Sequence, residues 1–140
     1  MTHDLFRFST TVQVRWRDLD LMGHVNNAVY LTYLEQARTC YMQELRTDFD
    51  APEDVGFIIA EITCNYRAPL KLGEQVTIWA RISELGNSSF VFEYRMEGGD
   101  GQVAATGRSV QVCYDYQNDQ PIPVPVKWRA AFTAYEPGLE

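Results

Sequence analysis

The stretch RDLDLMGHVNNAVY, from Arg17 to Tyr30, separates two segments whose apolar residues follow different periods. Before it, apolar and polar residues alternate, which predicts a strand over about residues 6–17. After it, apolar residues recur at offsets of three and four, which predicts an amphipathic helix over about residues 27–46. The stretch is therefore a strand-to-helix junction, and it concentrates short polar residues: two aspartates, a glycine, a histidine and two adjacent asparagines.

Strands dominate the rest of the chain. A loop is expected at residues 47–56 and a short second helix at residues 127–133. GGDG at residues 98–101 is a strong hairpin signal, because glycine adopts positive φ without steric cost. Gly107 is a candidate for a β-bulge in the last strand. The strands predicted after the first helix cover about residues 57–67, 73–82, 90–97 and 102–116.

This order of elements predicts the fold class. One long helix cannot bury its apolar stripe alone, and four consecutive strands joined by short turns favour an antiparallel sheet. We therefore expect an α+β fold in which an antiparallel five-stranded sheet wraps around one long central helix. The chain shows no repeat and no linker, so residues 1–140 are expected to form a single domain.

Composition and charge exclude several classes of protein. The 140 residues are 46% hydrophobic and 22% charged, which is typical of a globular domain, and they contain neither a membrane-spanning apolar run nor a signal-peptide pattern. The net charge of −7 argues against nonspecific binding to nucleic acid or anionic lipid. The three cysteines have no C-x-x-C spacing and are typical of reduced core residues in a cytoplasmic protein.

The junction carries groups suited to acyl transfer without serine or cysteine. A helix that begins near Asn26 or Asn27 presents unpaired backbone N–H groups, which bind a carbonyl oxygen more strongly as it becomes anionic. Asp20 could attack the carbonyl or activate water. Gly23 allows a tight turn and close approach of a substrate, and His24 could orient a carboxylate or a water.

The same residues also fit a turn that has no chemical role, because Asp, Gly and Asn are ordinary loop and cap residues. Residue types alone leave both interpretations open. Familiar alternatives are absent: the chain has no G-x-S-x-G, no phosphate loop and no G-x-G-x-x-G. No metal site is expected, because His24 with Asp18 or Asp20 supplies too few local ligands.

Two stretches resemble a known family. DLDLMGHVNNAVYLTYLEQAR and CNYRAPLKLGEQVTIWARISELGNSSFVFEYRM are similar to the hotdog-fold thioesterases, in particular the hydroxybenzoyl-CoA thioesterase-like group and its bacterial long-chain acyl-CoA relatives. The resemblance covers about residues 8–116. It implies a sheet wrapped around the helix, dimers whose sheets join edge to edge, often two dimers per tetramer, and an active site at the subunit interface.

The resemblance also implies roles for individual residues. The family's catalytic carboxylate corresponds to Asp20, its backbone donor at the helix start to Asn27, and the histidine of its H-V-N-N pattern to His24. Plant acyl-carrier-protein thioesterases have an asparagine where this chain has Met22, so the bacterial acyl-CoA version fits better. Some relatives place an acid on the central helix, and Glu35 is the candidate here, although a solvated or structural role is expected for it.

Several further residues are candidates for binding the substrate. Arg67 could pair with the phosphates of CoA, and the GNSS turn aligns with one that lies near CoA in relatives. If they have no role in binding, Arg67 is an ordinary surface cation and GNSS is a simple hairpin turn. The complete set of candidate substrate-binding residues is Gly23, Val25, Asn26, Arg67, Ser88 and Ser89.

The sequence thus predicts an acyl-CoA thioesterase that needs no cofactor, CoA being part of its substrate. A noncatalytic acyl-ligand binding module, an acyl-carrier-protein thioesterase and a hydratase-type hotdog enzyme are the alternatives. Asp18 is expected to support the turn rather than the chemistry, through hydrogen bonds to backbone N–H groups worth about 1 kcal/mol. The expectation rests on strand alternation, which is taken to turn the Asp18 and Asp20 side chains to opposite faces so that only one points at the pocket.

Overall fold

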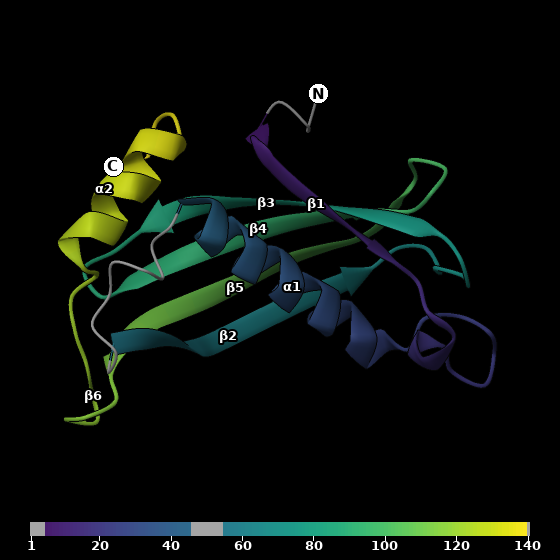
Figure 1. The fold of residues 1–140 in the computed structure, drawn as a ribbon, viewed down its shortest axis with the longest axis horizontal. Helices are drawn as coiled ribbons and strands as arrows, with labels where there is room; N and C mark the ends of the chain where they lie inside the picture. Colours follow the sequence, from purple (N-terminus) through teal and green to yellow (C-terminus); the bar gives the residue numbers. More distant parts are fainter. Residues whose placement is uncertain (1–4, 46–54, 140) are drawn as a thin grey trace.

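The computed structural model describes residues 5–45 and 55–139, which form an antiparallel sheet with a long helix lying across one face (Figure 1). The helices are α1 (Asn27–Leu45) and α2 (Val126–Tyr135), and one 3-10 turn, η2, covers Trp16–Asp18. No helix in this part of the chain is long and apolar enough to cross a membrane. The strands are β1 (Phe8–Gln13), β2 (Val55–Tyr66), β3 (Gln75–Leu85), β4 (Ser89–Glu97), β5 (Val103–Asp115) and β6 (Gln120–Pro121).

The sheet confirms the predicted α+β architecture. The strand order is β1-β3-β4-β5-β2, and each neighbouring pair is antiparallel. The two-residue strand β6 pairs with β5 and adds a sixth strand that the sequence pattern did not predict. The strands β1 and β2 lie at the two edges, and α2 lies at the end of the sheet where β3 turns into β4 (Figure 1).

The core lies between α1 and the inner face of the sheet. From the helix, Leu34, Ala37 and Tyr41 are almost completely buried. The alternation predicted for the central strands is confirmed, because alternate residues of β3 and β4 point into this core. In β3 and β4 the most completely buried residues are Val76, Ile78, Ala80, Ile82, Phe90, Phe92, Tyr94 and Met96.

Gly107 is a close-packing site and not the predicted β-bulge. It pairs in regular register with Cys64 of β2 and Tyr94 of β4. A Cβ atom at this position would lie 3.1 Å from Leu34 Cδ1 and 3.2 Å from the Thr63 carbonyl oxygen. The missing side chain therefore lets α1 approach the sheet, which is the other reason for a glycine within a strand.

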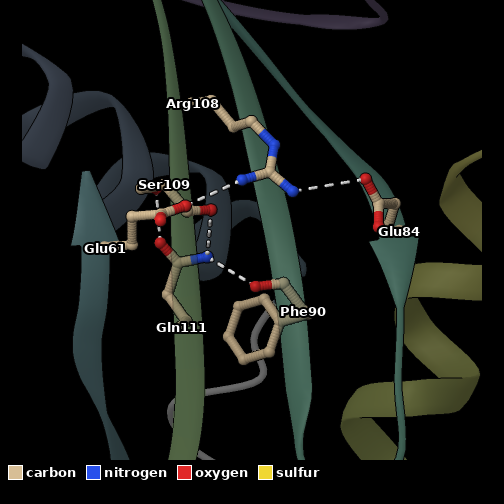
Figure 2. Close-up of polar contacts among 6 residues, drawn as sticks. All are labelled: Glu61, Glu84, Phe90, Arg108, Ser109 and Gln111. Atoms are coloured by element: carbon tan, nitrogen blue, oxygen red, sulfur yellow. Dashed lines mark hydrogen bonds and ion pairs between the residues drawn. The ribbon is translucent and has the colours of Figure 1, made fainter. Parts of the chain in front are cut away.

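Polar groups on the two faces of β5 make separate sets of contacts. On the inner side, the Arg38 guanidinium donates to the Tyr94 hydroxyl, which hydrogen-bonds to Ser109, and Ser109 contacts Gln111. Gln111 Nε2 also donates to the backbone oxygen of Phe90 (Figure 2). These bonds satisfy buried polar groups that an apolar core would otherwise leave unpaired. Arg108, next to Ser109 on β5, forms ion pairs with Glu61 and Glu84 (Figure 2).

The first strand is shorter than predicted: β1 ends at Gln13 and not near Arg17. The chain turns after Val14 because the Asp18 carboxylate accepts a hydrogen bond from the Arg15 backbone N–H at 3.0 Å, and the Asp18 N–H donates to the Arg15 carbonyl at 3.0 Å. This local bonding replaces ladder bonds and forms η2. Of the loop predicted at residues 47–56, residues 47–54 lie outside the described residues, and residues 55 and 56 belong to β2.

Candidate active site

The junction loop is closed by the side chain of Asp20. Its Oδ1 atom accepts hydrogen bonds from the backbone N–H groups of Met22, at 2.8 Å, and His24, at 3.2 Å. Gly23 has φ +83°, a left-handed conformation that glycine adopts without strain. In the part of the chain that the structure describes, no hydrogen bond reaches the second oxygen of this exposed carboxylate. One oxygen therefore holds the loop, and the other faces outward and is available to a ligand.

The start of α1 provides a hydrogen-bond donor near this carboxylate. Asn26 caps the helix: its side-chain oxygen accepts from the Ala28 N–H at 2.9 Å, and its backbone oxygen accepts from the Val29 N–H at 2.9 Å. The backbone N–H of Asn27 has no acceptor among the described residues. Together with the positive end of the helix dipole, this N–H suits a carbonyl oxygen that gains negative charge.

The helix start is held by groups far apart in the sequence. The Val25 N–H donates to the Leu70 carbonyl at 2.9 Å, and the Asn26 N–H donates to the Asp18 carbonyl at 2.9 Å. The Tyr66 hydroxyl, at the end of β2, donates to the Asn27 carbonyl at 2.8 Å. These bonds fix the first helical turn relative to the loop, so the donor is in place before any ligand arrives.

Asp18 has a different environment and is only 2% exposed. Its carboxylate accepts from the Arg15 backbone and guanidinium and from the Tyr33 hydroxyl, the last at 2.7 Å. Burial alone would raise the pKa of the Asp18 carboxyl, but the hydrogen bonds from Arg15 and Tyr33 outweigh it, so its pKa lies below the ordinary value. The same desolvation, with the bond to Asp18, raises the pKa of the Tyr33 hydroxyl. The Asp18 carboxylate thus makes the expected hydrogen bond to a nearby backbone N–H group, although a turn and not strand alternation separates it from Asp20.

Asp20 lines two hollows in the surface. The first has a volume of about 370 Å³ and contains the helix start and one cation. Its lining residues are Asp20, His24, Val25, Asn27, Tyr30, Tyr66, Arg67, Ala68 and Pro69. The second has a volume of about 650 Å³ and a more apolar lining. Its lining residues are Trp16, Arg17, Leu19, Asp20, Leu21, Gly23 and Asn26.

The structure brings most of the predicted site residues together, but not all of them. Asp20, His24, Val25, Asn27 and Arg67 line the first hollow, and Gly23 and Asn26 line the second. Glu35 is exposed on α1 and lines neither hollow.

Ser88 and Ser89 do not join this site within one chain. They lie at the turn between β3 and β4, where the Ser88 carbonyl accepts from the Cys113 N–H. In Figure 1 this turn is beside α2, at the opposite end of the sheet from the start of α1. Within one chain, GNSS is therefore a hairpin turn, the alternative in which it does not contact the substrate.

Sequence reasoning did not find several residues that line the site. Tyr30 and Tyr66 meet edge to face at 4.9 Å between ring centroids in the first hollow, and Trp16 and Leu21 line the second. The Trp16 and Leu21 positions carried a signal in retrospect, since both are large apolar residues in a stretch otherwise rich in turn formers. In the described ranges, no group of three His, Cys, Asp or Glu side chains is arranged to hold a metal ion.

Comparisons with known proteins agree on one family. A family model described as the thioesterase-like superfamily matches residues 14–132. The long-chain acyl-CoA thioesterase FadM of Escherichia coli (strain K12) is 30% identical to this chain, and the match covers 81% of this chain and 87% of FadM. The acyl-CoA thioesterase YbgC of Haemophilus influenzae is 27% identical over 89% of this chain and 93% of that protein.

A solved structure extends the agreement to the fold. A thioesterase from Thermus thermophilus, crystallised with coenzyme A and Zn, is 35% identical to this chain and superposes with a TM-score of 0.81. The match covers 95% of this chain and 96% of the other. The expected hotdog architecture, a sheet with one long helix against it, is confirmed by this likeness.

Proposed function

The chain belongs to the thioesterase-like superfamily, and from this premise we propose that it hydrolyses acyl-CoA thioesters to a free carboxylic acid and CoA. The observation that carries the proposal is the pairing of two groups in one hollow. A carboxylate oxygen of Asp20 and the backbone N–H of Asn27 both lack a partner among the described residues, and both residues line the same 370 Å³ hollow. A thioester carbonyl between them would meet a nucleophile or base on one side and a hydrogen-bond donor on the other.

Two routes fit these groups. In the first, the free Asp20 oxygen attacks the carbonyl carbon, CoA leaves as a thiolate that takes a proton from solvent, and water hydrolyses the mixed anhydride. In the second, Asp20 removes a proton from a water that attacks the same carbon, and the proton passes to the departing sulfur. In both, the Asn27 N–H stabilises the negative charge on the carbonyl oxygen, and the net reaction consumes one water.

We propose that the CoA portion of the substrate binds in the first hollow. Arg67 lines it, and the backbone of Lys71 pairs with that of His24 at its border. These cations can attract the CoA phosphates locally even though the chain carries −7 overall. A homodimer or a dimer of dimers, and a cytoplasmic location suited to the three free cysteines, complete the proposal.

The test is a screen of CoA thioesters that differ in their acyl group, with a thiol-trapping dye to detect released CoA. We expect release that depends on protein concentration for at least one acyl class. The contrary result is binding of acyl-CoA in calorimetry with no release of thiol, which would favour the noncatalytic binding module. Faster release from an acyl carrier protein than from CoA would favour the carrier-protein thioesterase.

A further inference from the structure

The two hollows that share Asp20 differ in chemistry. The first contains Arg67, His24 and the free donor of Asn27. The second is lined by three large apolar side chains, Trp16, Leu19 and Leu21, and by Arg17, Asp20, Gly23 and Asn26. A thioester whose carbonyl lies at the free oxygen of Asp20 therefore has the hollow of Arg67 and His24 on one side and the hollow of Trp16, Leu19 and Leu21 on the other.

The apolar side chains of the second hollow are unusually exposed. Trp16 is 79% exposed and Leu21 is 104% exposed, that is, fully. A cluster of large apolar side chains exposed on the surface is typical of a ligand-binding or protein-binding site. Leu19, which is partly buried against the core, also lines the hollow and connects it to the interior.

We propose that this second hollow binds the acyl chain of the substrate, and that Trp16 determines specificity for long apolar acyl groups. The proposal rests on the proposed thioesterase function, because Asp20 defines where the carbonyl lies. The carbonyl carbon of a thioester is trigonal, so the sulfur of CoA and the acyl chain leave it in different directions. We place the CoA half in the hollow of Arg67, and the methylene groups in the second hollow, where they would cover the exposed side chains of Trp16 and Leu21.

Continuity with the candidate carboxylate favours an acyl chain over a second protein as the occupant. Asp20, Gly23 and Asn26 all line the hollow, so its inner wall is the junction loop itself. Among the described lining residues, Arg17 supplies one positive charge and Asp20 one negative charge, so the hollow has no net charge to recruit an ionic partner. Its volume of about 650 Å³ is within the range of small-molecule sites.

The test measures binding with thioethers, which cannot be hydrolysed. Calorimetry compares S-dodecyl-CoA with S-ethyl-CoA for the wild type, Trp16→Ala and Leu21→Ala. We expect the wild type to bind the dodecyl compound more tightly, and Trp16→Ala to reduce the ratio of the two affinities by about 10-fold, the equivalent of one large apolar contact. Leu21→Ala should reduce the same ratio and provides a second test if Trp16→Ala does not fold. Val126→Ala is the matched control, since Val126 is 83% exposed on α2 and lines neither hollow.

Two results would overturn the proposal. One is an unchanged affinity ratio in both variants. The other is an equal loss for both thioethers together with a fall in molecular mass by light scattering, which would make Trp16 a contact between subunits. Failure of the proposed function is a separate outcome. If the wild type hydrolyses none of the CoA thioesters in the screen, the enzyme assignment is wrong, yet the thioether ratio still decides whether the hollow holds an alkyl chain.

Discussion

Asp18 and Asp20 are two residues apart and have opposite surroundings. The Asp18 carboxylate is buried and is fully engaged by Arg15 and Tyr33, whereas Asp20 is exposed and uses only one oxygen to close its loop. A group that activates water or attacks a carbonyl needs a free oxygen. Asp18 is therefore expected to support stability, and Asp20 is the proposed catalytic carboxylate.

Asp18→Asn should destabilise the protein. The substitution removes the charge that faces the Arg15 guanidinium at 3.0 Å and weakens the acceptor of the Tyr33 hydroxyl. Hydrogen bonds to charged groups contribute about 1.5–3 kcal/mol, but Arg15 is largely exposed, so we expect a loss of about 1–2 kcal/mol in the free energy of unfolding. Urea denaturation measures it. A variant as stable as the wild type would show that this network does not support the junction.

The same carboxylate predicts a pH dependence of stability. Because the pKa of Asp18 is lower in the folded protein than in the unfolded chain, its contribution is present above the unfolded pKa and is lost as the pH falls through the folded pKa. The gap in melting temperature between the wild type and Asp18→Asn should therefore be largest near neutral pH and shrink under acid. Thermal melts between about pH 3 and pH 7 measure this gap. A gap that stays constant over this range would contradict the assigned pKa shift.

The sequence predicted much of the arrangement of the candidate site, because most of its groups are close together in the chain. Asp20, Gly23 and the asparagine cap follow from turn and cap preferences that act over a few residues. The contact of Tyr66 with the Asn27 carbonyl joins residues 39 positions apart, and it depends on where β2 ends in space. Local preferences do not contain that information, and the same holds for the end of the sheet at which Ser88 and Ser89 lie.

The packing of α1 on the sheet depends on Gly107. Gly107→Ala places a Cβ 3.1 Å from Leu34 Cδ1 and 3.2 Å from the Thr63 carbonyl oxygen, so the helix or β2 must shift. Overpacking of this kind costs about 1–3 kcal/mol of stability, which denaturant unfolding can detect. Gly99→Ala is the matched control, because its nearest neighbour is 3.7 Å away and its φ is not in the left-handed region. Equal stability of the two variants would contradict the close approach.

Elements with a long regular period and the short helix α2 were predicted well, whereas β6 and the end of β1 were not. The residues that define β3, β4 and α1 repeat their period over nine or more positions, and their bounds agree with expectation to within a few residues. The strand β6 has two residues and cannot show a period. The end of β1 depends on the bond from the Arg15 N–H to Asp18, which interrupts an alternation that continues in the sequence.

The edge strand β2 predicts that the protein assembles at least into dimers. It has 12 residues and is paired on one side, by β5, and its exposed residues include Ile58 and Ile59, each 39% exposed. An open apolar edge is a pairing hazard that a two-fold axis removes. Light scattering should give about twice the chain mass of 16.1 kDa, whereas a monomer at micromolar concentration would contradict this. Ile59→Lys should lower the mass, and Val126→Lys, at an exposed apolar site on α2, should not.

The charge of the whole molecule favours CoA over acyl carrier proteins. The chain carries −7, and carrier proteins are strongly acidic, so their long-range repulsion should slow association at low salt. The same acyl group should therefore give a higher kcat/KM on CoA, and the gap should narrow as salt is added. A higher kcat/KM for the carrier protein would reverse the proposed substrate class.

The most direct test of the central claim, that Asp20 carries the reaction, is steady-state thioester hydrolysis by Asp20→Asn with Asp18→Asn as the matched control. Asparagine keeps an oxygen that accepts from the Met22 and His24 N–H groups, so the loop and the melting temperature should change little. The loss of a general base predicts that kcat falls by about 10²–10⁴ in Asp20→Asn, while folded Asp18→Asn turns over nearly as the wild type does. Wild-type turnover in Asp20→Asn would show that Asp20 is not the catalytic carboxylate, and another carboxylate, such as Glu35, would then be the candidate.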